Sequence, residues 1–240
     1  LFLTTVEPFL ERAGLRFEIV FVNDGSRDDT LSHLLDCSRR DQRIRVVNLS
    51  RNFGKEAALT AGIDHARGDI LIPMDIDLQD PPDLFVPFIE RWREGYDIVY
   101  GVRETRAWDT VSKRVSAGWF YWVFNRMSPV PIPAHVGDFR LVDRRAVEVL
   151  RRLPERNRFM KGLFAWVGFN AIGVAYERPQ RAAGSSKFNL WRLWNFALDG
   201  VVSFSTVPLR ASFYGGLAIA AIALLYALFI IGRVLIFGID

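Results

Sequence analysis

Two aspartates separated by one residue are the strongest chemical signal in the chain. Asp75 and Asp77 come at the end of an apolar stretch, 69–74, that has the pattern of a strand. Carboxylates placed together where a strand ends can direct oxygen atoms at one hard cation, and Mg²⁺ or Mn²⁺ often reaches a protein through one or two carboxylates plus substrate phosphates. A cation held in this way neutralises a leaving diphosphate. Out of context such a pair is more often two solvated turn carboxylates, so its meaning depends on its neighbours.

A second polar cluster, 23–26, ends an earlier strand pattern and precedes a helical one. Its Asp24 could accept a hydrogen bond from a base imide or a ribose hydroxyl. The alternative is that Asp24 and Ser26 form a turn and cap the next helix. The residues alone leave both interpretations open.

A third cluster, 50–55, places Asn52, Gly54 and Lys55 just before another helical pattern. Backbone amides and a lysine at the start of a helix attract phosphate. The alternative is an ordinary helix start with a solvated charge.

The elements that must position these clusters alternate between strand and helix patterns. Strands are predicted at 17–22, 44–49, 70–74 and 97–102, and helices at 28–40, 56–66 and 82–94. This alternation predicts an α/β fold with βαβ units and a mostly parallel sheet. Since right-handed crossovers place the carboxyl ends of such strands at one edge, the three clusters should share a crevice there.

The alternation of strand and helix patterns ends after Arg103. An aromatic helix is predicted at 111–127. Its rings could line a path for a long apolar ligand, or could be ordinary core or membrane contacts; they include Trp119, Phe120, Tyr121, Trp122 and Phe124. Residues 187–207 are aromatic but too polar to span a bilayer, which suits a helix in the membrane interface. The stretch 211–232 carries no charge and is long enough to cross the ~30 Å hydrocarbon core.

Composition limits the possible partners. The 240 residues carry a net charge of +4, and half of them are hydrophobic. Arginines concentrated before the apolar run place that side in the cytoplasm by the positive-inside rule and suit anionic lipid head groups and phosphates. Nucleic acid is a poorer partner, because no zinc spacing or aromatic RNA-binding signature accompanies the charge. The single Cys37 excludes an internal disulfide.

The three clusters, with the sequence around them, resemble signatures of glycosyltransferase family 2. The segments 21–30, 51–58 and 74–82 are similar to three successive motifs, and 137–141, 181–188 and 203–210 resemble supporting motifs of the polyprenyl-phosphate branch. The resemblance covers nearly the whole chain in the right order. It implies a GT-A type nucleotide-diphospho-sugar transferase domain at 1–180, juxtamembrane amphipathic helices at 181–210 and a transmembrane helix at 211–237.

The resemblance also implies roles for individual residues. Asp75 and Asp77 would hold Mg²⁺ or Mn²⁺ and the diphosphate, with Asp77 the more direct ligand. Asp138 and Asp77 would be the catalytic carboxylates. It also implies nucleotide-sugar contacts by Asp24, Ser26, Asn52, Lys55, Asp75 and Gln79, and acceptor-phosphate contacts by Arg103, Arg114, Arg140, Arg181 and Lys187. Asp138 could instead orient the acceptor, a metal or the sugar, or be a structural partner of Arg140.

Family members usually begin with a hydrophobic strand and a nucleotide-binding Pro-x-Tyr-Asn-Glu loop, and this branch usually has two membrane helices. The first residues here resemble the helix after that loop, so a strand before them and a second membrane helix beyond 237 are expected. The implied reaction is inverting transfer of a sugar, glucose from UDP-glucose or another sugar such as mannose or an aminoarabinose derivative, to undecaprenyl phosphate at the cytoplasmic face. A homotetramer is expected by resemblance, and the rival interpretation is an inactive membrane-anchored binding module.

Overall fold

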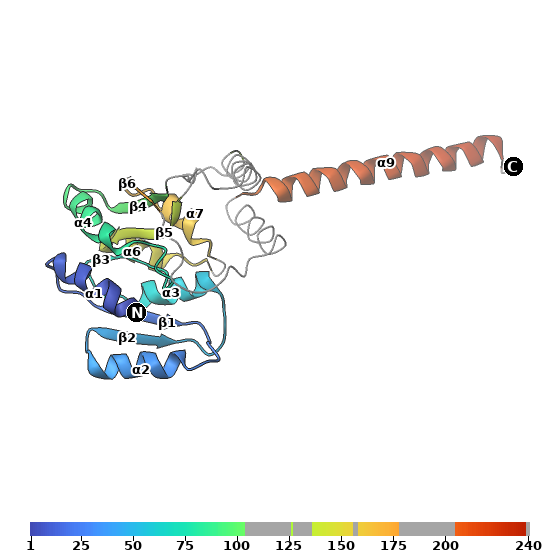
Figure 1. The fold of residues 1–240 in the computed structure, drawn as a ribbon. Helices are drawn as coiled ribbons and strands as arrows, with labels where there is room; N and C mark the ends of the chain where they lie inside the picture. The colour runs from blue at the N-terminus through green and yellow to red at the C-terminus, as the bar shows by residue number, and fades with distance from the viewer. Residues whose placement is uncertain (104–125, 127–135, 156–157, 178–204, 239–240) are drawn as a thin grey trace.

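The structure is a computed structural model that describes residues 1–103, 126, 136–155, 158–177 and 205–238. An α/β body is followed by one long helix that points away from it (Figure 1). The body contains the helices α1 (Phe2–Arg12), α2 (Thr30–Arg40), α3 (Lys55–His65), α4 (Phe85–Arg93), α6 (Arg144–Arg152) and α7 (Met160–Trp166), and a 3-10 turn at Pro82–Leu84. Its strands are β1 (Ile19–Asn23), β2 (Ile44–Asn48), β3 (Ile70–Leu71), β4 (Ile98–Arg103), β5 (Val136–Asp143) and β6 (Ala171–Tyr176).

The strands form two sheets in the described part of the chain. β1 and β2 pair in parallel, with Ile19 opposite Ile44. The other sheet has the order β3-β5-β4-β6. In it β4 and β6 are parallel, whereas β5 is antiparallel to both β3 and β4.

We expected a mostly parallel sheet, but β5 runs antiparallel to both of its neighbours. A strand buried on both faces has a continuous apolar pattern whichever way it runs, so its sequence does not reveal its direction. The reversal matters for function, because the first residues of β5 lie level with the last residues of β4: Val136 pairs with Val102. Asp138 therefore reaches the edge where β4 ends.

Helices cover both faces of the four-stranded sheet. On one face, side chains of α1 and α4 pack with Val99, Phe139 and Leu141. On the other, α3, α6 and α7 pack with Ile98 and Val142. Neighbouring residues of β4 and β5 thus point to opposite faces, as the two-residue period of a strand requires. This three-layer packing makes the sheet edge a rigid support for the loops that leave it.

The C-terminal helix α9 (Val207–Phe237) has no buried side of its own. An 18-residue stretch within Leu209–Phe237 has a mean hydropathy of 2.5, and none of that stretch is buried inside the protein. By length and composition α9 can cross a membrane. The predicted helices at 111–127 and 187–207 lie outside the described residues, apart from residue 126 and residues 205–207.

Candidate active site

Lys55 brings two of the predicted loops together with the start of β5. Its ammonium nitrogen lies 2.8 Å from a carboxylate oxygen of Asp75 and 2.8 Å from one of Asp138. Burial by itself lowers the pKa of Lys55, but the two carboxylates outweigh burial and the pKa ends above its usual value. The first residue of α3 is therefore a fixed positive charge between a loop after β3 and a residue near the start of β5.

Asp24 attaches the loop after β1 to the loop after β2. Its two carboxylate oxygens accept hydrogen bonds from the backbone N–H groups of Phe53, at 2.7 Å, and Gly54, at 2.9 Å. The two loops touch so closely that a Cβ on Gly25 would lie 2.4 Å from backbone atoms of Arg51 and Asn52. In this structure Asp24 thus organises the loop that carries Lys55; its contact with a nucleoside stays a prediction.

Asn23 stabilises the same region from within the sheet. Its buried side chain donates to Asn48 Oδ1 at 2.7 Å, and its Oδ1 accepts from the backbone N–H of Ser26 at 3.2 Å. The side chain of Asn52 is exposed beside this junction. The expected contacts of Ser26 and Asn52 with a nucleotide sugar remain predictions.

The loop after β3 is held in an unusual backbone conformation. Among the described residues, Leu78 is the non-glycine residue with a positive φ, 57°. A side-chain-bearing residue in this region costs about 1–3 kcal/mol, a strain found mostly where a structure must aim particular groups. Asp77 Oδ1 accepts from the backbone N–H of Gln79 at 3.2 Å, and Gln79 is buried.

Asp80, to which no role was assigned from the sequence, lies behind this loop. It is 3% exposed, and its carboxylate accepts from the Tyr176 hydroxyl at 3.4 Å and lies 3.9 Å from the Arg103 guanidinium. Burial raises the pKa of Asp80, with a further contribution from Asp75 and an opposing one from Arg103. The Asp-Pro-Pro segment after Gln79 was its one sequence signal.

Arg103 stands at the end of β4, as predicted, and is oriented by Tyr176. Its Nε donates to the Tyr176 hydroxyl at 3.1 Å. A Cβ on Gly137 would lie 2.6 Å from Arg103 Nη2, so the absence of a side chain there leaves room for the guanidinium. Burial lowers the pKa of Arg103, but Tyr176 and the nearby carboxylates of Asp80 and Asp138 outweigh it.

Arg140 lies behind Asp138 instead of facing outward. It is 4% exposed, its Nη2 donates to the Gly137 carbonyl at 2.6 Å, and its guanidinium lies 4.1 Å from the Phe164 ring centroid. Burial lowers the pKa of Arg140 to about 10, which leaves it charged near neutral pH. This placement supports a role in holding the backbone of 137–138 and gives no support to the expected contact with acceptor phosphate.

Asp138 is a mostly buried carboxylate that remains ionised. Burial raises its pKa, but Lys55 and Lys161 outweigh burial and bring the pKa below its usual value. Its second oxygen, Oδ1, is buried without a hydrogen-bond partner among the described residues. A hydroxyl group of a ligand could donate to that oxygen.

The described carboxylates fit a divalent cation only as part of its coordination shell. No group of three or more His, Cys, Asp or Glu side chains within the described residues is arranged to hold a metal ion. Asp75 and Asp77 supply two hard oxygen ligands, which matches the way Mg²⁺ is bound when substrate phosphates and water complete its shell. Asp75 would have to exchange its ion pair with Lys55 for the metal.

Several predicted site residues lie outside the described residues. These are Arg114, Arg181 and Lys187, and the aromatic residues Trp119, Phe120, Tyr121, Trp122 and Phe124. The site as described therefore comprises the loops after β1, β2 and β3, the facing ends of β4 and β5, and α7.

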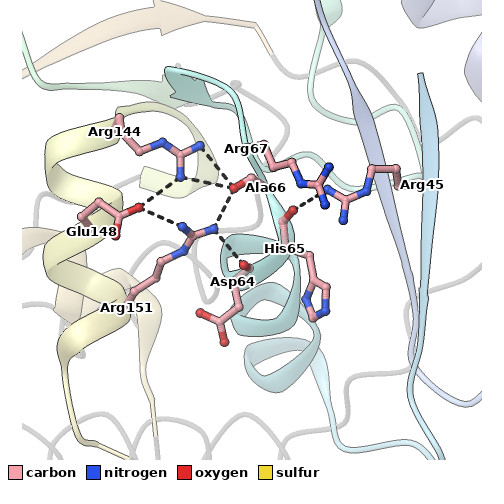
Figure 2. Close-up of a pocket in the computed structure, with 8 residues that line it drawn as sticks. All are labelled: Arg45, Asp64, His65, Ala66, Arg67, Arg144, Glu148 and Arg151. Atoms are coloured by element: carbon pink, nitrogen blue, oxygen red, sulfur yellow. Dashed lines mark hydrogen bonds and ion pairs between the residues drawn. The ribbon is translucent and has the colours of Figure 1, made fainter. Parts of the chain in front are cut away.

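A polar hollow lies at the C-terminal end of α3, away from this site, and its arginines have a structural role. This hollow, of about 480 Å³, contains Arg45, Arg144 and Arg151 (Figure 2). Arg144 and Arg151 both donate to the Ala66 carbonyl, and Arg45 donates to the His65 carbonyl at 2.7 Å. These guanidinium groups satisfy the carbonyls that a helix leaves unpaired at its C-terminus, where positive charge is also favoured.

Comparison with known protein families shows to which family the chain belongs. The profile of the family described as Glycosyl transferase family 2 matches residues 2–151, which include every loop of the site and more than half of the chain. The chain belongs to glycosyltransferase family 2. Membership confirms the expected α/β, GT-A type fold and shows that this family 2 chain is a glycosyltransferase enzyme.

Known glycosyltransferases are similar over most of the chain. An uncharacterized glycosyltransferase of Synechocystis sp. is 51% identical over 226 residues, which cover 94% of this chain and 71% of that protein. A bactoprenol glucosyl transferase of Shigella phage SfV is 48% identical over 237 residues, 99% of this chain and 77% of that protein. The solved structure of a Pyrobaculum calidifontis mannosyltransferase with GDP-Man and Mn²⁺ covers 91% of this chain, with a TM-score of 0.46 and 18% identity.

Proposed function

We propose that this enzyme transfers glucose from UDP-glucose to undecaprenyl phosphate, with inversion at the anomeric carbon. The proposal rests on one observation above all: Lys55, Asp75 and Asp138 form a single charged cluster where β3 and β4 end and β5 begins. Relatives named bactoprenol glucosyl transferase, 47–48% identical over 99% of the chain, support the choice of sugar and lipid. A candidate membrane helix in the same chain suits a lipid acceptor.

The donor diphosphate would lie against the loop after β3. Asp75 and Asp77 would hold Mg²⁺ or Mn²⁺ there, and the cation would neutralise the charge that develops on the leaving UDP. Lys55 stands at the N-terminus of α3, where free backbone N–H groups also attract phosphate. These two features give the leaving group a positively charged environment.

The acceptor needs little help from a base. A phosphate monoester has a second pKa near 6 and is largely dianionic at neutral pH. A general base works best when its pKa lies near the working pH, whereas the pKa of Asp138 lies below even the usual value of a carboxylate. Asp138 is thus better suited to orient the sugar or the acceptor: an acceptor phosphate oxygen bonds to the anomeric carbon while the bond from that carbon to UDP breaks.

Arg103 is the candidate for holding the acceptor phosphate. It stands at the end of β4, and its guanidinium is oriented by Tyr176 and is 30% exposed. A guanidinium can hold two phosphate oxygens at once. Its ion-pair distance of 3.9 Å to Asp80 leaves that capacity largely unused.

The membrane arrangement follows from the same chemistry. The site would face the cytoplasm, where nucleotide sugars are made, and α9 would cross the inner membrane with the basic residues before it on the cytoplasmic side. The expected homotetramer, the interfacial helices at 181–210 and a second membrane helix remain predictions.

A panel of radiolabelled nucleotide sugars, each incubated with undecaprenyl phosphate and the enzyme in lipid nanodiscs, tests the proposal. We expect label from UDP-glucose in the lipid fraction, and none when either aspartate of the loop after β3 is changed to asparagine. Transfer of mannose or an aminoarabinose derivative in preference to glucose would overturn the choice of sugar. Absence of transfer from every donor would overturn the proposed reaction.

A further inference from the structure

One charged residue near the site, Lys161, belongs to none of the loops after β1, β2 and β3. Lys161 is in the first turn of α7, and it is the one charged residue of that helix, Met160–Trp166. It is partly buried. The charged groups that act on it are Asp138, Glu56, Lys55, Arg103 and Arg140, so it lies at the same cluster as the proposed reacting groups.

The position of Lys161 is set by two contacts of α7. The backbone N–H of Met160 donates to Glu56 Oε2 at 3.0 Å, which ties the start of α7 to the residue after Lys55. One turn later, the Phe164 ring packs against the guanidinium of Arg140. Since residues three apart share a helix face, Lys161 lies on the face of α7 that Phe164 turns toward β5.

The ammonium group of Lys161 has no close partner among the described residues. Within the described residues it makes no hydrogen bond and no ion pair within 4 Å, whereas Lys55 is shared by two carboxylates and Arg103 has Tyr176 and Asp80. Burial lowers the pKa of Lys161; Asp138 opposes this shift, and Arg103, Lys55 and Arg140 add to it. A partly buried cation without a close partner is unfavourable until an anion arrives.

A second polar group without a partner among the described residues, the Asp138 carboxylate oxygen Oδ1, lies on β5. Asp138 Oδ1 is buried without a hydrogen-bond donor, while Lys161 lacks an acceptor within the described residues. A ligand that carries both a hydroxyl and a phosphate would satisfy the two at once, and sugar phosphates are of this kind.

We propose that Lys161 binds a phosphate oxygen at the transfer site, either of the donor diphosphate or of the acceptor monophosphate. The inference rests on the proposed function for the identity of these two phosphates. It adds a binding residue from α7, a helix that none of the sequence motifs includes. Lys161 then provides a second ammonium group at the site, beside that of Lys55.

Binding measurements on the full chain in nanodiscs test this proposal. Lys161→Met keeps the length of the side chain and removes its charge, and Arg152→Ala removes an exposed charge at the end of α6 as the matched control. The two ligands are UDP with Mn²⁺ and a short-chain polyprenyl monophosphate, each measured by calorimetry without sugar transfer. Loss of a charged hydrogen bond predicts a dissociation constant about ten- to a hundredfold higher for one or both ligands.

The pattern of loss identifies the phosphate. Weaker UDP binding assigns Lys161 to the donor, and weaker polyprenyl phosphate binding assigns it to the acceptor. The melting temperature should stay the same or rise, because a desolvated charge has been removed, and Lys161→Arg should retain part of the affinity. Unchanged affinity for both ligands, or a lowered melting temperature with equal losses in Lys161→Met and Lys161→Arg, would overturn the proposal.

A measurement on the unmodified sequence keeps the test independent of any variant. Acetylation of Lys161 by a water-soluble reagent, followed by mass spectrometry, should slow when the ligand is added, and a rate unaffected by both ligands contradicts the proposal. These outcomes are separate from the transfer assay. If the ligands protect Lys161 but no sugar is transferred, the proposed reaction fails and the phosphate contact stands.

Discussion

At the residue scale, the charged side chains of the site bind one another before they bind a ligand. Lys55 holds Asp75 and Asp138, and Arg103 holds Tyr176 and lies near Asp80. These pairs place each of these charges beside a partner of opposite charge or a hydrogen-bonding group. Ligand binding must therefore exchange partners, and single substitutions should affect particular ligands more than the fold.

Asp77→Asn should abolish transfer while the protein stays folded. The change removes one of the two carboxylates expected to hold the divalent cation, and an amide is a poorer ligand for Mg²⁺ or Mn²⁺. Transfer of labelled sugar and the melting temperature would be measured together. Asp83→Asn, an exposed carboxylate in the following 3-10 turn, is the control that should keep full activity. Full turnover in excess EDTA would refute the metal requirement.

Arg103→Ala should weaken the use of lipid phosphate more than the binding of the nucleotide sugar. Loss of a charge-assisted contact costs about 1.5–3 kcal/mol, or about ten- to a hundredfold. The loss should appear in kcat/KM for polyprenyl phosphate, with donor affinity nearly unchanged by calorimetry. A larger loss of donor affinity would assign Arg103 to the diphosphate instead.

Gly137→Ala should reproduce part of this effect without touching Arg103 itself. The added Cβ would come within 2.6 Å of Arg103 Nη2, at the end of a flexible side chain that can move aside. Stability should change little, while kcat/KM for the lipid falls. Because both changes act through one guanidinium, their effects should not add in the double variant. Additive losses would show that Gly137 acts in another way.

The loss of activity at acidic pH should follow protonation of the acceptor phosphate and not protonation of Asp138. The pKa of Asp138 is lowered, so this carboxylate stays ionised as the pH falls toward the second phosphate pKa, which is near 6. Activity in kcat/KM should decline as the phosphate gains its proton. Replacing the phosphate by a phosphonate of different acidity should move the decline. A decline that does not move would identify a group of the enzyme.

At the scale of elements, the loops after β1 and β2 are packed as one unit. Asp24 holds the backbone of the second loop, and Gly25 lies directly against it. The start of α3, and with it Lys55, is positioned by a residue some thirty positions earlier in the chain. The donor site therefore depends on contacts between connections as much as on the sheet.

Gly25→Ala should separate these two loops. A non-glycine residue at its φ of +65° costs about 1–2 kcal/mol, and the clash with the second loop adds to that cost. Gly14→Ala is a matched control, because Gly14 has a φ of +67° and open space around it. Urea unfolding should show a larger loss for Gly25→Ala, and only this variant should lose UDP affinity. Equal losses of stability would mean that the loop contact contributes nothing.

At the scale of the whole molecule, the α/β body is followed by α9, a helix long enough to cross a membrane. The uncharged stretch between Arg210 and Arg233 would rise about 33 Å at about 1.5 Å per residue, close to the ~30 Å hydrocarbon core. The two arginines would then lie at opposite interfaces.

Cysteine labelling tests this topology in a background with Cys37→Ser. A cysteine at Ser205 should react only from the cytoplasmic side, and one at Gly238 only from the outer side. The Cys37→Ser protein without added cysteines is the control for background labelling. Labelling of both positions from the same side would show that α9 does not cross the membrane.

The sequence by itself determined the parts of this protein that depend on short stretches of chain. The strands and helices predicted before Arg103 lie close to their observed bounds, because apolar periodicity is a local property, but β3 ends at Leu71 and β5 was not predicted. The place of Asp75 after a strand, the place of Lys55 at a helix start and the span of α9 could be predicted for the same reason. The family followed from several such motifs in order.

Only the tertiary structure decided which groups meet. The reversed direction of β5 places Asp138 beside Lys55, and a buried strand looks the same in sequence whichever way it runs. Arg140 is buried against Phe164, and Tyr176 and Lys161 enter the site from segments with no chemical pattern of their own. Asp80 lies inside a motif, but only the fold brings it to Tyr176 and Arg103. Charge and hydrogen bonding act across space at a few ångströms, and distances of that kind are set by packing and not by spacing along the chain.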